Sequence, residues 1–330
     1  LGCVIKANAY GHGLLRVAQA LRNSADGFAL LDLQEAIALR EAGIRQPILM
    51  LEGFFSPDDL TLFAEYALTP VVHSREQLEI LAAASLPTRL PVYLKINTGM
   101  NRLGFEVGEA KEALVALAAI PDAGGVTLMS HFADADNERG INAQLEQFAM
   151  VREGYDKLPS SLANSATLLR FPQACGDWAR PGIMLYGASP MPQIQSAQKL
   201  GLQPVMSLNS EIIAVRNVQK GERIGYGGLF EAKEAMRTGI VACGYADGYP
   251  RGAPSGTPIL IDGQYTRTLG QVSMDMLAVD LTSLARAGVG SPVVLWGEGL
   301  PVDDVATSAG TVSYELLCAL APRVPVTEVL

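Results

Sequence analysis

A lysine close to the start of the chain has the surroundings of a residue that binds a carbonyl group covalently. Lys6 follows the apolar segment Cys3–Ile5 and precedes a loop that runs to Gly13. Lysine is rare in an apolar setting unless it is paired or has a chemical role, and burial lowers its pKa because the charged form loses hydration. A neutral amine forms a Schiff base with an aldehyde. The segment therefore favours covalent carbonyl chemistry, the structural alternative being a lysine that extends its ammonium group to solvent.

Strand-like and helix-like segments alternate over the first two-thirds of the chain. Eight strands are predicted, at Cys3–Ala7, Gly27–Leu31, Pro47–Leu51, Leu68–Val72, Pro91–Ile96, Gly125–Ser130, Ser161–Ser165 and Gly182–Tyr186. Amphipathic helices are predicted between most of them, including Leu33–Ala42, Arg75–Ala84, Ala110–Ala119 and Ala143–Lys157. This alternation predicts a parallel sheet, and eight units predict an α/β fold of the (β/α)8 TIM-barrel type. An open doubly wound sheet is the alternative, although no G-x-G-x-x-G pattern follows a strand.

The pattern changes near Pro204. Short strand-like runs separated by glycine turns are predicted at Leu208–Arg216, Thr238–Gly244, Pro258–Ile261, Ser273–Asp280 and Pro292–Trp296, with a helix at Ser313–Ala321. We therefore expect a barrel domain over residues 1–203 and a mainly β domain over residues 204–330.

Composition narrows the class of protein. The 330 residues are 49% hydrophobic with a net charge of −9, and no basic run favours nucleic acid or a membrane surface as a partner. The four cysteines are scattered, which fits a reducing cytoplasm and argues against a metal site. No apolar run reaches the length of a membrane span. Because the chain begins within a predicted strand at Leu1, we expect that an N-terminal segment is missing.

Polar residues stand at the ends of the predicted strands, where a barrel of this kind forms its active site. All three histidines are among them, together with a lysine, an arginine and hydroxyl groups: Lys6, Tyr10, His12, His73, Lys95, Arg102, His131, Ser165 and Arg180. The Ser165 hydroxyl and the amides near Gly182 are suited to phosphate binding, although Asn164-Ser165 is also typical of a helix cap. A lysine opposite a phosphate site is the arrangement that pyridoxal phosphate requires, whereas an aldolase that uses lysine alone needs no phosphate site.

Four motifs in order carry a resemblance to a known family. They are VIKANAYGHG at 4–13, RPGIMLYG at 180–187, GYADGYPR at 244–251 and VSMD at 272–275. The chain resembles the alanine racemases, which are fold-type III pyridoxal phosphate enzymes, through both domains. The resemblance implies pyridoxal 5'-phosphate as cofactor, L- and D-alanine as substrates and a homodimer with shared active sites.

The resemblance also implies roles for individual residues. Lys6, which carries the cofactor, and Tyr226, which enters from the other subunit, are the implied catalytic bases. The implied cofactor contacts are Lys6, Tyr10, His131, Ser165, Arg180, Gly182, Ile183 and Tyr314. Arg102 and Met274 are implied at the substrate carboxylate, and Lys95 is implied to be carbamylated, with its new negative charge holding Arg102. Asp136, Tyr245 and Arg251 are implied at the substrate entrance.

The chemistry agrees with these roles. Racemisation removes a proton from one face of the α-carbon and returns one to the other face, so two bases are wanted. An arginine beside the pyridine nitrogen, here Arg180, cannot take up a proton and keeps that nitrogen neutral, which we expect to suppress transamination.

Two positions depart from many relatives, and three other functions stay open. Gln271 stands where many relatives have arginine, and Asn97 where many have aspartate, which removes a negative charge near Lys95 and Arg102.

The alternative functions are a racemase for another amino acid such as serine, a pyridoxal phosphate-binding protein without turnover, and a decarboxylase. The second domain argues against the binding protein, and Arg180 argues against the decarboxylase.

Overall fold

The computed structural model describes residues 1–329, and the chain forms two compact units. The first contains Leu1–Ala9 and Gly13–Leu185, and the second contains Tyr10–His12 and the chain from Tyr186 onward. Among the described residues, none of the helices has both the length and the apolar character that crossing a membrane requires.

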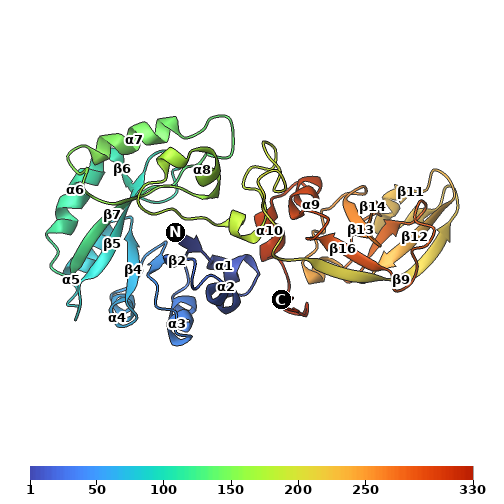
Figure 1. Ribbon diagram of the computed structural model, residues 1–330, viewed down its shortest axis with the longest axis horizontal. Coiled ribbons are helices and arrows are strands. Elements are labelled where there is room, and N and C mark those ends of the chain that lie inside the picture. Colours follow the sequence, from blue (N-terminus) through green and yellow to red (C-terminus); the bar gives the residue numbers. More distant parts are fainter. Residues whose placement is uncertain (330) are drawn as a thin grey trace. The chain divides into compact units, whose positions relative to one another are not determined.

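The first unit is a curved parallel sheet with helices along its outer side (Figure 1). Its strands are β1 (Gly2–Val4), β2 (Gly27–Leu30), β3 (Ile48–Met50), β4 (Leu68–Val72), β5 (Leu90–Asn97), β6 (Phe105–Glu106), β7 (Ala123–Met129) and β8 (Ser160–Ser161). They pair in the order β1-β2-β3-β4-β5-β7-β8, with the short β6 beside β5. The helices are α2 (Leu14–Ala20), α3 (Leu33–Glu41), α4 (Pro57–Glu65), α5 (Arg75–Ala83), α6 (Val107–Ala118), α7 (Asn142–Arg152) and α8 (Ser165–Arg170). The predicted fold class is confirmed.

The prediction of an eighth strand at Gly182–Tyr186 is wrong. Residues 183–186 form a 3₁₀ turn. The eighth position is occupied instead by residues 178–181. They bond to β1 on one side (Gly2 N to Ala179 O, 2.8 Å) and, on the other, to the chain just after β8 (Arg180 N to Ala163 O, 2.8 Å). Pro181 has no N–H to donate, but its carbonyl accepts from Val4 N at 2.9 Å.

Local sequence explains where the barrel helices begin and end. Ser56 and Asp59 form a reciprocal capping box at the start of α4, and Ser74 caps α5. The predicted helix Ala143–Lys157 ends earlier, at Arg152. The predicted strand Ser161–Ser165 is shorter, because Ser165 already belongs to helix α8.

The second unit contains a closed antiparallel barrel (Figure 1). Its strands are β9 (Leu208–Val218), β12 (Met236–Val241), β13 (Pro258–Ile261), β14 (Gln264–Leu269), β15 (Leu277–Asp280) and β16 (Pro292–Trp296), in the order β12-β15-β14-β13-β16-β9. A small hairpin of β10 (Arg223–Ile224) and β11 (Phe230–Glu231) and the helices α9 (Val302–Ser308) and α10 (Ser313–Cys318) complete it. Strand β14 was not predicted, because its outward positions carry polar residues such as Gln264 and Arg267.

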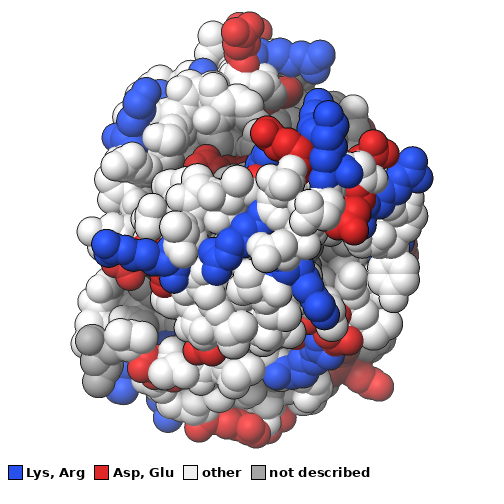
Figure 2. All heavy atoms as spheres, turned by 90° about the vertical axis from the view of Figure 1, so that its right-hand side faces the viewer, with Lys and Arg blue, Asp and Glu red and all other residues white. Residues whose placement is uncertain are grey.

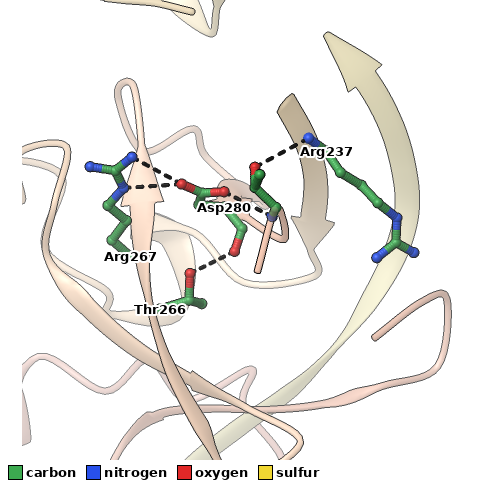
Figure 3. Close-up of polar contacts among 5 residues, drawn as sticks. Arg237, Thr266, Arg267 and Asp280 are labelled. Carbon is green, nitrogen blue, oxygen red and sulfur yellow. Dashed lines mark hydrogen bonds and ion pairs between the residues drawn. The ribbon is translucent and has the colours of Figure 1, made fainter. Parts of the chain in front are cut away.

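Asp280 of β15 bonds to two residues of the neighbouring strand β14 (Figure 3). Arg267 donates to Asp280 Oδ2 through Nε (3.1 Å) and Nη2 (3.0 Å), and Thr266 Oγ1 donates to the Asp280 carbonyl (2.6 Å). Burial alone would raise the pKa of Asp280, but the Thr282 amide and Arg267 outweigh this effect and hold the pKa below its ordinary value.

The surface of the molecule seen in Figure 2 mixes basic and acidic side chains, so neighbouring charges partly offset each other there.

Candidate active site

Lys6 leads directly from the buried core of the first unit into an unusual turn. Strand β1 ends at Val4, so Lys6 lies beyond the strand and not inside it as predicted. Ile5 before it is fully buried, whereas Lys6 itself is half-buried. The next residues, labelled α1 with Lys6 (Lys6–Tyr10), have φ near +50° and form a left-handed turn. The turn fixes the direction in which the chain leaves the lysine.

Three of the predicted residues line one opening at the carboxyl ends of β5 and β7. Lys95, Arg102 and His131 surround a small opening there. A second opening lies near the amino-terminal ends of the strands, where Gly27 and Pro47 line it. Because barrel enzymes use the carboxyl ends, the opening at Lys95 is the candidate site.

Lys95 is a buried lysine among other cations. Lys95 is only 7% exposed. Burial, with Arg102 and Arg180 adding to the effect, lowers its pKa from 10.5 to about 8, and Glu52 offsets only part of this. A sizeable fraction of Lys95 is therefore neutral close to physiological pH.

Arg180 is buried without a carboxylate among its hydrogen-bond partners. It is 4% exposed, and its Nη2 donates to the carbonyls of Ser130 (2.7 Å) and Leu162 (3.4 Å), while Nη1 donates to Ser161 Oγ. Burial lowers its pKa to about 10. The guanidinium therefore stays charged at neutral pH, and neutral oxygen atoms fix its orientation.

His131 is held in its neutral form beside Arg180. Arg180 Nη2 donates to His131 Nδ1 at 3.4 Å. Burial first, and then the charges of Arg180, Arg102, Lys95 and Lys6, keep the pKa of His131 well below its ordinary value. Since arginine only donates, Nδ1 is the acceptor and Nε2 carries the ring proton.

The predicted phosphate-binding groups of the first unit lie together. Ser165 is the first residue of α8, where Asn164 is the cap and accepts from Thr167 N. The Ser165 hydroxyl accepts from Gly182 N at 2.8 Å and from Met184 N at 3.5 Å. Ile183, between them, is fully buried. The hydroxyl and the neighbouring amides thus form one polar cluster at a helix N-terminus, which favours an anion.

The predicted phosphate contacts of the second unit belong to a cluster of tyrosines. The Tyr10 ring stacks on Tyr186 with centroids 4.7 Å apart and is tilted against Tyr314 at 5.9 Å. Burial, with Tyr314 adding to it, raises the pKa of Tyr10 far above its ordinary value. The Tyr10 phenol therefore remains protonated and can donate a hydrogen bond.

Two loops of the second unit are joined through the residues predicted at the substrate. Tyr245 N donates to Ser273 O (3.0 Å), and Ala246 N donates to Met274 O (2.9 Å). A Cβ at Gly244 would lie 2.3 Å from Ser273 O, so only glycine allows this approach. The structure therefore brings Tyr245 and Met274 side by side.

The remaining predicted residues lie at exposed positions. Tyr226 is 70% exposed in a 3₁₀ turn between β10 and β11. Asp136 is exposed on the loop between β7 and α7, and Arg251 is exposed after a 3₁₀ turn at Tyr245–Asp247.

Sequence reasoning missed two residues that organise these loops. Arg323 bridges the two loops of the second unit, donating to Asp247 (2.8 Å) and Asp275 (2.7 Å). Glu106 accepts from Asn97 Nδ2 at 2.8 Å, so a carboxylate stands where the sequence suggested that one had been lost. The pattern held no signal for either contact, since both residues read as ordinary surface charges.

Comparison with known proteins agrees with the fold. Residues 1–190 match the family model "Alanine racemase, N-terminal domain", and residues 205–328 match "Alanine racemase, C-terminal domain". A catabolic alanine racemase of Klebsiella aerogenes is 57% identical over 99% of this chain and 91% of its own length.

Two solved structures extend the comparison. The biosynthetic alanine racemase of Pseudomonas aeruginosa has a TM-score of 0.94 and 47% identity, covering 98% of this chain and 90% of that one. An alanine racemase of Bartonella henselae with covalently bound pyridoxal phosphate has a TM-score of 0.87 and 26% identity, again covering 98% and 90%.

The barrel, the second domain and these matches define a racemase, which is an isomerase. The chain belongs to the alanine racemase family.

Proposed function

We propose that this chain interconverts L- and D-alanine with pyridoxal phosphate by a two-base mechanism, in a homodimer whose two active sites are shared. The observation that carries the proposal is the group of cations in the first unit. Lys6, Arg102 and Arg180 all act on the pKa of Lys95 or His131, and Glu52 is the carboxylate that acts in the opposite direction on Lys95.

The residues present fit the cofactor. A phosphate group and a substrate carboxylate are anions, and both would be attracted by this excess of positive charge. When bound, pyridoxal phosphate withdraws electrons from the α-carbon of the substrate and so makes its proton easier to remove. The Bartonella henselae enzyme carries covalently bound pyridoxal phosphate, which supports the same cofactor here.

The phosphate would be held by hydrogen-bond donors. We propose that the hydroxyl of Ser165 and the amides of Gly182 and Ile183 donate from the first unit, and that Tyr10 and Tyr314 contribute phenolic groups. The Gly182 amide, which donates to Ser165 in this structure, would then be shared with the anion. The high pKa of Tyr10 favours this role, because a donor must keep its proton.

Arg180 would face a ring nitrogen as a fixed, charged donor. With a pKa of about 10, it stays protonated near neutral pH. It would therefore donate a hydrogen bond without transferring a proton, which would limit how much negative charge the ring can take up and favour rapid return of the proton to carbon. The neutral His131 beside it adds no further charge.

Two bases on opposite faces complete the proposal. Lys6 acts on one face of the α-carbon, and Tyr226 of the partner subunit acts on the other. The 70% exposure of Tyr226 leaves its ring accessible to another subunit, as this role requires.

The substrate would be held by charge and by one backbone amide. We propose that Arg102 binds the alanine carboxylate, assisted by the Met274 amide, and that carbamylated Lys95 fixes Arg102. At the entrance we place Asp136, Tyr245 and Arg251, which are all exposed or half-exposed.

Proton exchange in deuterated water tests the proposal. The wild-type enzyme is expected to lose the α-proton of either enantiomer and to form the other. Tyr226→Phe keeps one base, so we expect exchange of one enantiomer with almost no inversion, whereas Lys6→Ala loses both. Tyr265→Phe, at an exposed tyrosine that bonds to Gly299 O, is the matched control and keeps full activity. Exchange and inversion of both enantiomers by Tyr226→Phe would contradict the two-base mechanism.

A further inference from the structure

The turn that follows Lys6 adopts a backbone conformation that its residues do not favour. Ala7, Asn8, Ala9 and Tyr10 have φ values of 53°, 52°, 53° and 52°. Left-handed backbone is unfavourable for L-residues, and among these four only asparagine tolerates it comparatively well. Contacts from elsewhere must therefore hold the turn in place.

Asn8 is the point at which these contacts meet. Its side-chain Oδ1 accepts from Leu14 N at 2.8 Å, and its carbonyl accepts from Gly13 N at 2.9 Å, which fixes the start of α2. Its own N–H donates to Glu35 Oε1 at 3.2 Å. The last contact joins the left-handed turn to another helix, α3.

Glu35 lies at a position where a glutamate side chain normally caps the N-terminus of its own helix. It is the third residue of α3, and its N–H donates to the cap residue Asp32 Oδ1 at 2.9 Å. A glutamate at this place usually accepts from the cap residue's own amide. Here the carboxylate accepts from Asn8 instead, and burial raises its pKa above the ordinary value. The Glu35 carboxylate is therefore partly desolvated where it contacts the loop that follows Lys6.

We propose that Glu35 is a positioning residue for Lys6. By accepting the hydrogen bond from the Asn8 N–H, its carboxylate holds the left-handed turn in place and with it the direction of the lysine amine. The inference rests on the proposed role of Lys6 as the residue that carries the cofactor. The alternative is that Glu35 only stabilises the N-terminus of α3 through its charge.

Side-chain length and charge separate these two roles. Glu35→Gln keeps the length and an acceptor oxygen but removes the charge, whereas Glu35→Asp keeps the charge and shortens the side chain by one methylene. Both residues are tolerated at the start of a helix. Glu41→Gln, at the exposed other end of α3, is the matched control.

Cofactor titration and amide exchange are the two measurements. For pyridoxal phosphate binding to cofactor-free protein, followed by absorbance, we expect Glu35→Asp to bind roughly tenfold more weakly and Glu35→Gln to stay within about threefold of wild type. Hydrogen exchange of the cofactor-free protein at residues 7–10 is expected to speed up in Glu35→Asp alone. Glu41→Gln is expected to match wild type in both measurements.

Three outcomes would overturn the inference. These are wild-type affinity in Glu35→Asp, an equal loss in Glu35→Gln, and a loss of affinity without faster exchange at residues 7–10. If the wild-type protein does not bind pyridoxal phosphate through Lys6, the proposed function fails instead, and the exchange measurement still decides whether Glu35 holds the turn.

Discussion

Lys95 is expected to react with dissolved carbon dioxide in preference to the exposed lysines. Carbamate forms from the neutral amine, and the pKa of Lys95 is lowered to about 8 from 10.5 by burial and by neighbouring cations. At pH 7, about one tenth of Lys95 is then neutral, compared with about one in three thousand for an ordinary lysine, an advantage of about 300-fold. The product replaces a positive charge by a negative one beside Arg102, which the surrounding cations favour.

Labelled bicarbonate provides the assay. With ¹³C-bicarbonate near neutral pH, we expect one carbamate carbon resonance, lost in Lys95→Met and kept in Lys111→Met. Lys111 is the matched control because its side chain is 47% exposed and only 3.8 Å from Glu153 in a surface pair. A resonance that persists in Lys95→Met, or no resonance in the wild-type protein, would refute the reasoning.

The same pKa predicts a stability effect of opposite sign to that of a paired lysine. Because folding disfavours the charged form of Lys95, the free energy of unfolding should rise as the pH increases from about 8 to about 10.5 in CO₂-free buffer, by about 3 kcal/mol in total. Lys95→Met should lack this rise. Unfolding curves of the two proteins that run parallel over this pH range would show that the amine is not desolvated as the structure indicates.

Two further substitutions test the loops around the site. Asn97→Asp places a second carboxylate near Glu106, whose Oε1 lies 2.8 Å from Asn97 Nδ2. We expect a loss of about 1–3 kcal/mol in unfolding free energy at neutral pH, and this loss should shrink as the pH falls and one carboxyl is protonated. Urea unfolding checks it on this variant and on the Asn97→Asp/Glu106→Gln double variant, which should lack the pH effect. Arg323→Ala removes the bridge between Asp247 and Asp275, so we expect a higher KM for alanine with unchanged pyridoxal phosphate affinity in steady-state kinetics, and an unchanged KM would count against the bridge.

The barrel was predictable where its strands are continuous apolar runs. Segments such as Ile48–Met50 are apolar and buried along their whole length, which is the pattern of a parallel strand covered on both faces. The eighth position was mispredicted for the opposite reason. The residues that fill it include Arg180 and Pro181, which do not read as a strand, whereas the apolar run Ile183–Leu185 belongs to a 3₁₀ turn. Tertiary contacts on both sides decided the outcome there.

The candidate site was predictable where strand ends determine position. Lys95 lies near the end of β5 and His131 just after β7, so the fold topology alone places them at one edge of the sheet. Glu35 could not be recognised, because a glutamate three residues after Asp32 is the pattern of an ordinary capped helix. Its contact with Asn8 depends on the left-handed backbone of Ala7–Tyr10, which the residue types in this segment do not predict.

The charge distribution explains why these parts depend on one another. The chain has a net charge of −9, yet its candidate site gathers Lys6, Lys95, Arg102 and Arg180 within mutual electrostatic range. Like charges that are buried are unfavourable without compensation, and the hydrogen-bond partners described for Arg180 are neutral. A phosphate, a substrate carboxylate and a carbamate on Lys95 would each supply negative charge to this group. We therefore expect ligand binding to stabilise the first unit, and carbamylation of Lys95 would replace one of the repulsive charges that act in this group with an attractive one.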